Sequence, residues 1–425
     1  MLQCLWLVRR LSVLLMLTVP AGVAAETALP ASVTVAKVLE LLRESPRYVV
    51  LRTQIDQARA EVTGAGVLPN PRISYGRYDL ISRTNTMYDG RAQENYTLEV
   101  PVQIAGQRGA RVETAQRGVA RSEAGVQAEF QGMAREVWSL FVKLLVAQEQ
   151  VRVLQESADD LARLHQIVQG RQQGGSASSY DVLRIGVETG NLQNRLAGAR
   201  ADVDGASGAL AVALGFKEWH PRAEGRLAPL GVGIESERAQ VAAQQGNPEL
   251  EVARRGEGVA DAALEQARRE RWPTPSLLLG SAFTDRPYGN TTYAGVSVEL
   301  PIFDRNQGGM ARAEAAKRIA LLERESVSAR TQAEVEVAVD QVRQRRSVLE
   351  SFQREVLQPL PELKDMAENA YRLGKGSLLE LLDAARSRTE IRINHLNLLQ
   401  AEIEAELDLL KAIGELGRAA GIARP

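Results

Sequence analysis

The chain has 425 residues but a single cysteine, and aromatic residues make up only 4% of it. The lone cysteine excludes a disulfide within the chain. Because aromatic residues are scarce while Ala, Leu, Glu, Gln and Arg are abundant, the composition is typical of long helices rather than of compact cores. The 52 basic and 53 acidic residues nearly cancel, so bulk charge gives no reason to expect a nucleic-acid partner.

The N-terminal segment has the pattern of a secretory signal peptide. Two arginines precede an apolar run at 11–19, and small residues at 23–25 offer a cleavage site before Glu26. Cleavage would remove residues 1–25 and with them Cys4, so the mature chain would have no disulfide and no acylation site. The alternative is an uncleaved anchor, which the shortness of the run disfavours. No apolar run of 18 or more residues follows Ala25, so we expect no helix to span a membrane.

One pattern occurs twice, about 200 residues apart. In residues 292–312, apolar and polar side chains alternate as in a β-strand, a proline ends the alternation, and glycines then open a long helix. Residues 95–111 repeat this order. The aligned pairs are Glu99 with Glu299 and Pro101 with Pro301. The chain therefore reads as two copies of one supersecondary unit.

A second repeated signal consists of two prolines at alternate positions, at 69 and 71 and again at 273 and 275. Such a pair ends a helix and forces extended backbone, so each pair predicts a helix followed by a strand. The four predicted strands are about 72–80, 94–102, 276–285 and 292–302. The predicted strand–helix junctions carry Pro69, Pro71, Pro101, Pro273, Pro275 and Pro301.

Long helices fill most of the remaining sequence. Apolar residues spaced alternately four and three apart run from Met133 to Val168, which indicates coiled-coil packing. Glycine- and serine-rich breaks at 169–179 and 373–376 predict helical hairpins over 105–215 and 305–417, and Pro359 and Pro361 predict a kink. The predicted organisation is a first repeat at 26–215, a linker at 216–234, a second repeat at 235–417 and a tail at 418–425, each repeat beginning with short helices.

The predicted fold is therefore mainly α with a small β part. Four strands cannot close a barrel, whereas two chains would supply eight strands around a filled interior and three would supply twelve around an aqueous lumen. Six of the nine tyrosines lie in or beside the strands, which predicts an aromatic belt at a membrane interface unless tyrosine simply favours strands. They are Tyr75, Tyr78, Tyr88, Tyr96, Tyr288 and Tyr293.

Four motifs of the chain resemble those of a known family. The motifs that carry the resemblance are Leu68-Pro-Asn-Pro71, Glu99-Val-Pro101, Gly106-Gln-Arg-Gly-Ala-Arg111 and the stretch Tyr371 to Ala384. They resemble the TolC family of outer-membrane efflux ducts over about residues 33 to 417, and the Gly-Gln-Arg stretch is most similar to the branch that serves heavy-metal efflux pumps. The resemblance implies a homotrimer, with a twelve-stranded barrel among the lipids of the outer membrane and a helical tunnel in the periplasm. It also implies a periplasmic adaptor (membrane fusion) protein and an inner-membrane pump such as an RND transporter as partners.

The resemblance also assigns residues to a periplasmic aperture. The acidic positions that narrow the family's entrance fall on Glu380 and Asp383, where a threefold ring of carboxylates would hold the aperture and attract cations. The family's basic partner position falls on Gly376, with Lys375 beside it, which departs from the family pattern. The alternative is that these acids are ordinary charges in a first helical turn.

Two further sets of residues are predicted to be functional. Glycine permits the reversal at each hairpin tip and exposes backbone to an adaptor, although a plain turn is the alternative. Glu99 and Glu299 are expected to face a barrel lumen, where charge is tolerated. The predicted tip residues are Gly174, Gly175, Ser176, Gly374, Lys375, Gly376 and Ser377.

Other side chains suggest no chemistry. The three histidines, His165, His220 and His395, are far apart, so no metal site is predicted, and we find no nucleophile–base pair, phosphate loop or cofactor motif. His165 reads as a packing position and the arginines at 343, 345 and 346 as a solvated helix face. We therefore expect a passive exit duct of a tripartite efflux system and not an enzyme. The alternatives are the outer-membrane component of a type I protein secretion system and a secreted periplasmic coiled-coil scaffold.

Overall fold

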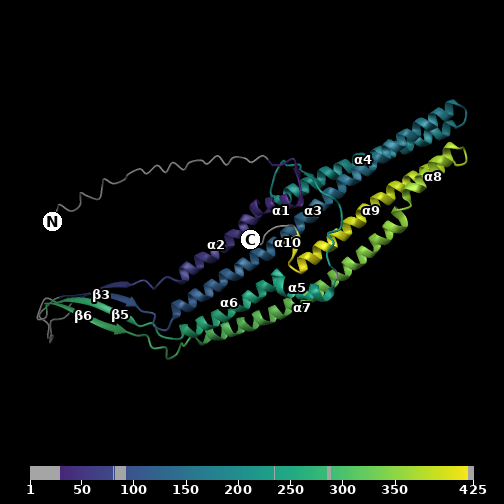
Figure 1. Ribbon diagram of the computed structural model, residues 1–425. Coiled ribbons are helices and arrows are strands. Elements are labelled where there is room, and N and C mark those ends of the chain that lie inside the picture. Colours follow the sequence, from purple (N-terminus) through teal and green to yellow (C-terminus); the bar gives the residue numbers. More distant parts are fainter. Residues whose placement is uncertain (1–28, 80, 82–91, 234, 285–288, 420–425) are drawn as a thin grey trace, which may run out of the picture.

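A computed structural model describes residues 29–79, 81, 92–233, 235–284 and 289–419. The predicted signal peptide with Cys4, the loop tyrosines Tyr88 and Tyr288, and the end of the predicted tail lie outside the described residues. The molecule is elongated, with a small sheet at one end, two helical hairpin turns at the other, and short helices around the middle (Figure 1).

The two halves of the chain contain the same elements in the same order. The first repeat comprises α1 (Val35–Glu44), α2 (Pro46–Ala65), β2 (Arg72–Asp79), β3 (Ala92–Pro101), α3 (Gln107–Gln173) and α4 (Ser179–Leu214). The second comprises α5 (Ser236–Gly246), α6 (Pro248–Glu270), β5 (Ser276–Thr284), β6 (Gly289–Ser297), α7 (Gln307–Phe352), a π-helix (Gln353–Leu357), α8 (Leu360–Arg372) and α9 (Leu378–Ala412). In addition, β1 (Ser32–Val33) pairs in parallel with β4 (Arg222–Ala223), and α10 (Leu416–Ala419) follows α9. The prediction of a mainly helical two-fold repeat with four principal strands is confirmed.

Local sequence explains where the helices begin. Ser45 and Asn247 cap α2 and α6 through their side-chain oxygens, and in both cases a proline occupies the first helical position. The long helices α3 and α7 each follow a residue in the left-handed conformation, Gly106 (φ 74°) and Asn306 (φ 57°). The repeat is thus preserved down to the backbone conformation of its corners.

The helix α3 is the central element, because it packs against α2 and α6 towards the sheet and against α4 and α9 towards the hairpin tips. Most of the predicted heptad positions on it are buried, including Val137, Leu144 and Val168. His165 is only half-buried, and Leu164 takes the buried place beside it. Side chains between the heptad positions, such as Trp138 and Val142, are also buried, because α3 is covered on more than one side.

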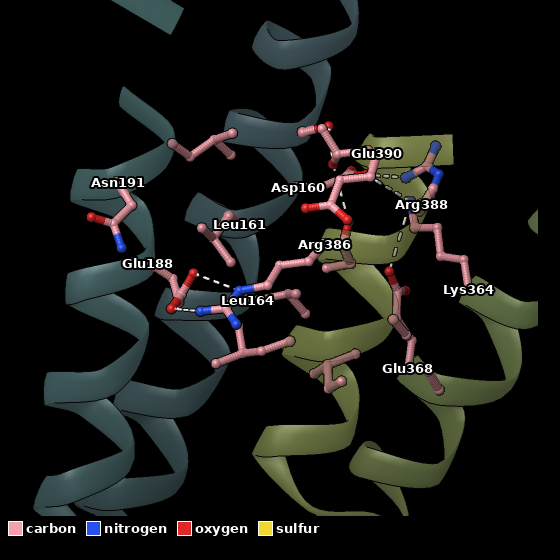
Figure 2. Close-up of a pocket in the computed structure, with 18 of the residues that line it drawn as sticks. Asp160, Leu161, Leu164, Glu188, Asn191, Lys364, Glu368, Arg386, Arg388 and Glu390 are labelled. Atoms are coloured by element: carbon pink, nitrogen blue, oxygen red, sulfur yellow. Dashed lines mark hydrogen bonds and ion pairs between the residues drawn. The ribbon is translucent and has the colours of Figure 1, made fainter. Parts of the chain in front are cut away.

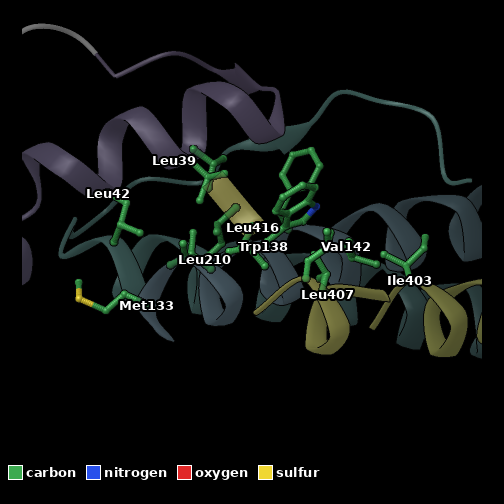
Figure 3. Close-up of a cluster of buried hydrophobic side chains, with 14 of the residues drawn as sticks. Leu39, Leu42, Met133, Trp138, Val142, Leu210, Ile403, Leu407 and Leu416 are labelled. Carbon is green, nitrogen blue, oxygen red and sulfur yellow. The ribbon is translucent and has the colours of Figure 1, made fainter. Parts of the chain in front are cut away.

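The main hydrophobic core lies where α1, α4, α9 and α10 pack on α3, at the middle of the molecule (Figure 1), and Figure 3 shows its side chains. Leu39 of α1, Leu210 of α4, Leu407 of α9 and Leu416 of α10 meet there, and each is 1% exposed or less. The indole Nε1–H of Trp219 donates to the Pro30 carbonyl at 3.0 Å, which fixes the linker to the start of the chain. The middle therefore holds the two repeats together.

The four strands form one antiparallel sheet in the order β2-β3-β5-β6. Its register sorts side chains by face, because residues directly opposite one another point to the same side. One row consists of Ile73, Leu98, Leu279 and Ala294, and the next row, on the other face, of Ser74, Thr97, Gly280 and Tyr293. The sheet thus has an apolar and a polar face, and β2 and β6 are its open edges.

Two expectations about the strands need correction. β6 ends at Ser297 rather than about residue 302, because β5 begins at Ser276, opposite Ser297, and leaves residues 298–301 without a strand beside them. Pro301 therefore lies beyond the strand, whereas Pro101 is the last residue of β3.

The tyrosines do not all fit an aromatic belt. Tyr75 and Tyr96 lie on the apolar face, but the register places Tyr78 and Tyr293 on the polar face. The Tyr293 ring covers Gly280 and its hydroxyl bonds to the Thr97 hydroxyl two strands away. Only two of these four tyrosines therefore lie where a lipid-facing belt requires them.

The helix of the second hairpin is interrupted at the position where Pro359 and Pro361 predict a kink. The π-helix ends two residues before Pro359, and α8 begins directly after that proline. The ring of Phe352 stacks on His395 of α9 with centroids 6.5 Å apart. Among all helices of the described residues, none is both long enough and apolar enough to cross a membrane.

Candidate functional site

The two hairpin tips form the end of the molecule opposite the sheet (Figure 1). At the first tip, Gly174 follows the last residue of α3 and Gly175 takes a left-handed φ of 73°; at the second, Gly374 has a φ of 70°. Of the predicted tip residues Gly174, Gly175, Ser176, Gly374, Lys375, Gly376 and Ser377, all are exposed except Gly376, which is half-buried. Glycine is required where φ is positive, so the backbone reversal itself accounts for Gly175 and Gly374.

Each tip leads into a helix with a capping box. The Ser178 hydroxyl accepts from the Asp181 N–H at 3.2 Å, and the Asp181 carboxylate accepts from the Ser178 N–H at 2.9 Å. Ser377 and Glu380 make the same reciprocal pair, also at 3.2 and 2.9 Å. The carboxylate of Glu380 is therefore engaged in starting α9.

An arginine joins the two tips. Arg171, at the end of α3, donates through Nη1 to the Tyr371 carbonyl at 2.5 Å, and its guanidinium lies 4.7 Å from the centre of the Tyr371 ring. Tyr371 is buried. One side chain thus holds the last turn of α8 against the last turn of α3.

Ion pairs continue this connection away from the tips, around a cavity of about 340 Å³ between the hairpins (Figure 2). The Asp160 carboxylate of α3 accepts from Lys364 of α8 at 3.0 Å and from Arg388 of α9 at 2.5 Å. Glu188 of α4 accepts a two-pronged hydrogen bond from Arg386 of α9. Polar contacts therefore link the first hairpin to both helices of the second.

The charges of this network are stable at neutral pH. Burial acts to raise the pKa of the Asp160 carboxyl, but the hydrogen bonds from Lys364 and Arg388 outweigh it and hold that pKa below its usual value. At Glu156, burial again acts to raise the pKa, and hydrogen bonding with Arg392, 2.7 Å away, lowers it overall. Both carboxylates thus remain ionised and paired.

A family model described as "Outer membrane efflux protein" matches residues 38–216 and 240–415, most of the chain. The chain belongs to this family. It is an outer-membrane efflux channel of the TolC family, a transport protein and not an enzyme. Membership implies a trimeric channel that works with efflux partners, and it excludes the secreted scaffold.

Proteins of known identity resemble the channel along most of its length. The chain is 28% identical over 367 residues to the cobalt-zinc-cadmium resistance protein CzcC of Cupriavidus metallidurans, covering 85% of each. It is 28% identical over 391 residues to protein CyaE of Bordetella pertussis, covering 86% of this chain and 80% of CyaE. A crystal structure of CusC superposes with a TM-score of 0.71 at 19% identity, over 89% of this chain and 92% of CusC. The last likeness shows the fold.

The predicted aperture residues of the channel differ from one another. Glu380 is committed to the capping box, whereas Asp383, one turn later, is exposed and has no hydrogen bond or ion pair among the described residues. Lys375 is exposed, and Gly376 donates its N–H to the Ala370 carbonyl at 3.0 Å. An aperture role thus stays a prediction for both acids, and Asp383 is the freer of the two.

The predicted barrel residues lie at the other end of the channel. Glu99 is on the polar face of the sheet, 3.9 Å from Arg72, as a lumen residue would be. Glu299 lies two residues past the end of β6. The alternate prolines Pro69 with Pro71 and Pro273 with Pro275 stand between α2 and β2 and between α6 and β5, as predicted.

A buried charge cluster was missed from the sequence. Arg346 of α7 is not on a solvated face: it donates to Glu402 at 2.9 Å and to Glu406 at 2.8 Å, and both glutamates are 0% exposed. Glu406 also accepts from the backbone N–H groups of residues 230–232 in the linker, at 2.5 to 3.1 Å. The cluster thus fastens the linker to α7 and α9. A signal was available, because Glu402 and Glu406 are four residues apart and fall beside Ile403, Leu407 and Leu410, which are spaced as on one buried face of α9.

Proposed function

We propose that the channel is the exit duct of a tripartite efflux system, which passively conducts metal cations or small toxic compounds from a periplasmic adaptor and an inner-membrane pump to the exterior. The observation that carries this proposal is that every layer of the molecule has two open edges. In the sheet the edges are β2 and β6, and among the hairpin helices they are α4, which packs on α3, and α8, which packs on α9. Such edges are completed by further copies of the chain.

A homotrimer satisfies all of these edges at once. Three copies supply twelve strands, enough for an aqueous lumen, with the apolar face of Ile73, Leu98 and Leu279 turned to lipid and the polar face turned inward. The same ring continues through the long helices into a periplasmic tunnel. The hairpin tips, exposed at the far end, are the surface that we assign to the adaptor and an RND-type pump.

The similarity to CzcC supports metal cations as cargo, since that relative is named for resistance to cobalt, zinc and cadmium. Within the described residues no cluster of three or more His, Cys, Asp or Glu could hold a metal ion. Cations would therefore pass through solvent in the lumen. A second candidate is the outer-membrane component of a type I protein secretion system, because a wide aqueous lumen does not by itself select small cargo.

A complementation experiment distinguishes the two cargoes. Deleting the gene in its host should lower tolerance to cobalt, zinc or cadmium salts, and a plasmid copy should restore it. A variant with the first tip removed (residues 171–178) serves as a control that still inserts into the membrane but should not restore tolerance. Unchanged metal tolerance together with loss of a secreted protein from the medium would favour the type I assignment.

Neutralising the aperture acids should change conductance at the periplasmic end. We expect the E380Q/D383N trimer in a planar bilayer to show weaker cation selectivity and a conductance raised about twofold or more, since the carboxylate ring would no longer attract cations or hold the entrance. D383N alone should produce most of the effect, because Glu380 is engaged with Ser377. The matched control is D181N in the first helical hairpin, because Asp181 holds the same place in the Ser178 capping box as Glu380 holds in the Ser377 capping box. If the double variant had the conductance and selectivity of wild type, the assignment of Glu380 and Asp383 to the aperture would be wrong.

A further inference from the structure

The contact between the two repeats supplies a template for the contact between copies of the chain. Within the chain, β3 of the first repeat pairs with β5 of the second, and Pro101 stands opposite Ser276. One residue further on, the Val102 N–H donates to the Pro275 carbonyl at 2.8 Å. Gln107, which is 3% exposed, then donates its side-chain amide to the Trp272 carbonyl at 3.3 Å. These contacts join the strand–helix corner of one repeat to that of the other.

At the free edge of the sheet the equivalent groups turn back on their own chain. Ile302, the counterpart of Val102, donates its N–H to the Leu300 carbonyl at 2.9 Å. Gln307, the counterpart of Gln107, donates its amide to the Phe303 carbonyl at 3.1 Å. The glutamines otherwise match, since each side-chain oxygen accepts from the N–H two residues earlier. The free edge thus has the same donor groups as the β3–β5 contact within the chain, which we call the internal seam. It lacks a neighbouring strand–helix corner whose carbonyls could accept from them.

We propose that β6 of one copy pairs with β2 of the next in the register of the internal β3–β5 seam. This inference rests on the trimeric channel proposed above and adds the residues that close it. Counterparts differ by 200 residues between β3 and β6, as for Pro101 and Pro301, and by 204 between β2 and β5, as for Pro71 and Pro275. Transferring the seam then gives three opposed pairs between copies. They are Pro301 with Arg72, Glu299 with Ser74, and Ser297 with Gly76.

The faces of the sheet agree with this register. It places Leu300 opposite Ile73 and Val298 opposite Tyr75, and Ile73 and Tyr75 lie on the apolar face. Glu299 comes opposite Ser74, on the polar face with Glu99. A slip of one residue would turn Leu300 towards the lumen and Glu299 towards lipid, which is expensive. The pairing also explains why residues 298–301 leave the strand within a single chain.

The strand–helix corner completes the contact. Leu68 stands before its proline pair as Trp272 does before Pro273, so the Gln307 amide of one copy meets the Leu68 carbonyl of the next. Two large apolar side chains at this corner, Leu68 at 62% and Phe303 at 91% exposure, are left open in the single chain. Their burial between copies would remove apolar surface from water.

Disulfide crosslinking tests the register. In the internal seam the Val102–Pro275 position is hydrogen-bonded, so Glu99–Leu278 is a non-hydrogen-bonded pair, and Glu299–Ser74 is its equivalent between copies. Cα atoms in such pairs lie about 4.5 Å apart, within the range of a disulfide. The S74C/E299C chain should therefore form a reducible covalent trimer on mild oxidation of membranes.

The controls are registers slipped by two residues. A shift of two residues already separates the registers of the two hairpins. Ser276 and Ser297 pair in β5–β6, and their counterparts in the first repeat are Arg72 and Thr97, but Arg72 pairs with Glu99 instead. A register shifted by two residues is therefore the arrangement that competes with the proposed one. Diagonal neighbours are about 7–8 Å apart, and R72C/E299C and G76C/E299C should crosslink several-fold less. Faster crosslinking of either control in an intact trimer would overturn the register while leaving the channel in place. Monomeric protein without any crosslink would instead contradict the trimeric channel.

Discussion

Replacing Gly414 with alanine is expected to destabilise the channel strongly. Gly414 follows the C-cap residue of α9 in the left-handed conformation, with φ 73°, and the N–H groups of Gly414 and Glu415 donate back to the carbonyls of Lys411 and Leu410, as in a Schellman motif. A Cβ at this position would overlap the carbonyl of Gly246 at the corner between α5 and α6. Left-handed backbone costs about 1–2 kcal/mol in any residue with a Cβ, and overpacking adds about 1–3 kcal/mol.

Thermal unfolding of the purified protein in detergent measures this effect. We expect Tm to fall by about 5 °C or more for G414A. The control is G417A, where a Cβ would contact nothing within 4 Å, and its Tm should stay within about 1 °C of wild type. Equal melting of both variants would show that the close packing of α9 on the α5–α6 corner is not needed for stability.

Removing the charge of Arg346 is expected to have the second large effect. Arg346→Met keeps an apolar side chain of similar length but leaves Glu402 and Glu406, both fully buried, without their cation. Breaking a buried pair by removing one partner costs about 3–5 kcal/mol. The linker at residues 230–232 would lose its anchor as well, because Glu406 holds it. Proteolysis in the linker should accelerate together with the loss in Tm.

The pH dependence separates a charge effect from a packing effect. Burial raises the pKa of the Glu402 carboxyl, and the neighbouring Glu406 adds to the rise while Arg346 opposes it. A group with a raised folded pKa contributes stability fully below its unfolded pKa of about 4.3 and loses it as pH rises through the folded value. Without Arg346 nothing in this cluster opposes the rise, so the folded pKa of Glu402 should be higher in R346M than in wild type and the variant should lose more stability as pH rises. The loss of unfolding free energy in R346M relative to wild type should therefore be larger at pH 8 than at pH 5.

The neighbouring arginine provides the matched control. Arg343 lies on the same helix and pairs with Asp340 on the surface, where both side chains are more than half exposed. R343M should change the free energy of unfolding by less than about 1 kcal/mol at either pH. A deficit in R346M that does not change with pH would mean that packing, not charge, accounts for the role of Arg346.

Much of the fold could be predicted from the sequence because its signals are local. Prolines at alternate positions end α2 and α6, and the glycines at 175 and 374 supply positive φ at the tips. The heptad spacing along α3 predicts its packing without knowledge of which helices cover it. Signals that depend only on neighbours in the chain were therefore sufficient for the elements and their order.

Features that depend on contacts between residues far apart in the chain could not be predicted from these local signals. Arg346 looks like a surface residue because it follows Arg343 and Arg345, and only the fold places it against two glutamates about sixty residues later. Glu380 matched an aperture position by resemblance, although its spacing from Ser377 is also that of a capping box. The early end of β6 depends on a strand that the single chain does not contain.

The most direct test of the whole account is the mass and conductance of the purified full-length channel in detergent. Native mass spectrometry should give three copies of the mature chain, and insertion of that species into a planar bilayer should open a steady, ion-conducting pore. A monomer that stays soluble without detergent and conducts no ions would contradict the central claim that several copies pool their strands to enclose a water-filled path.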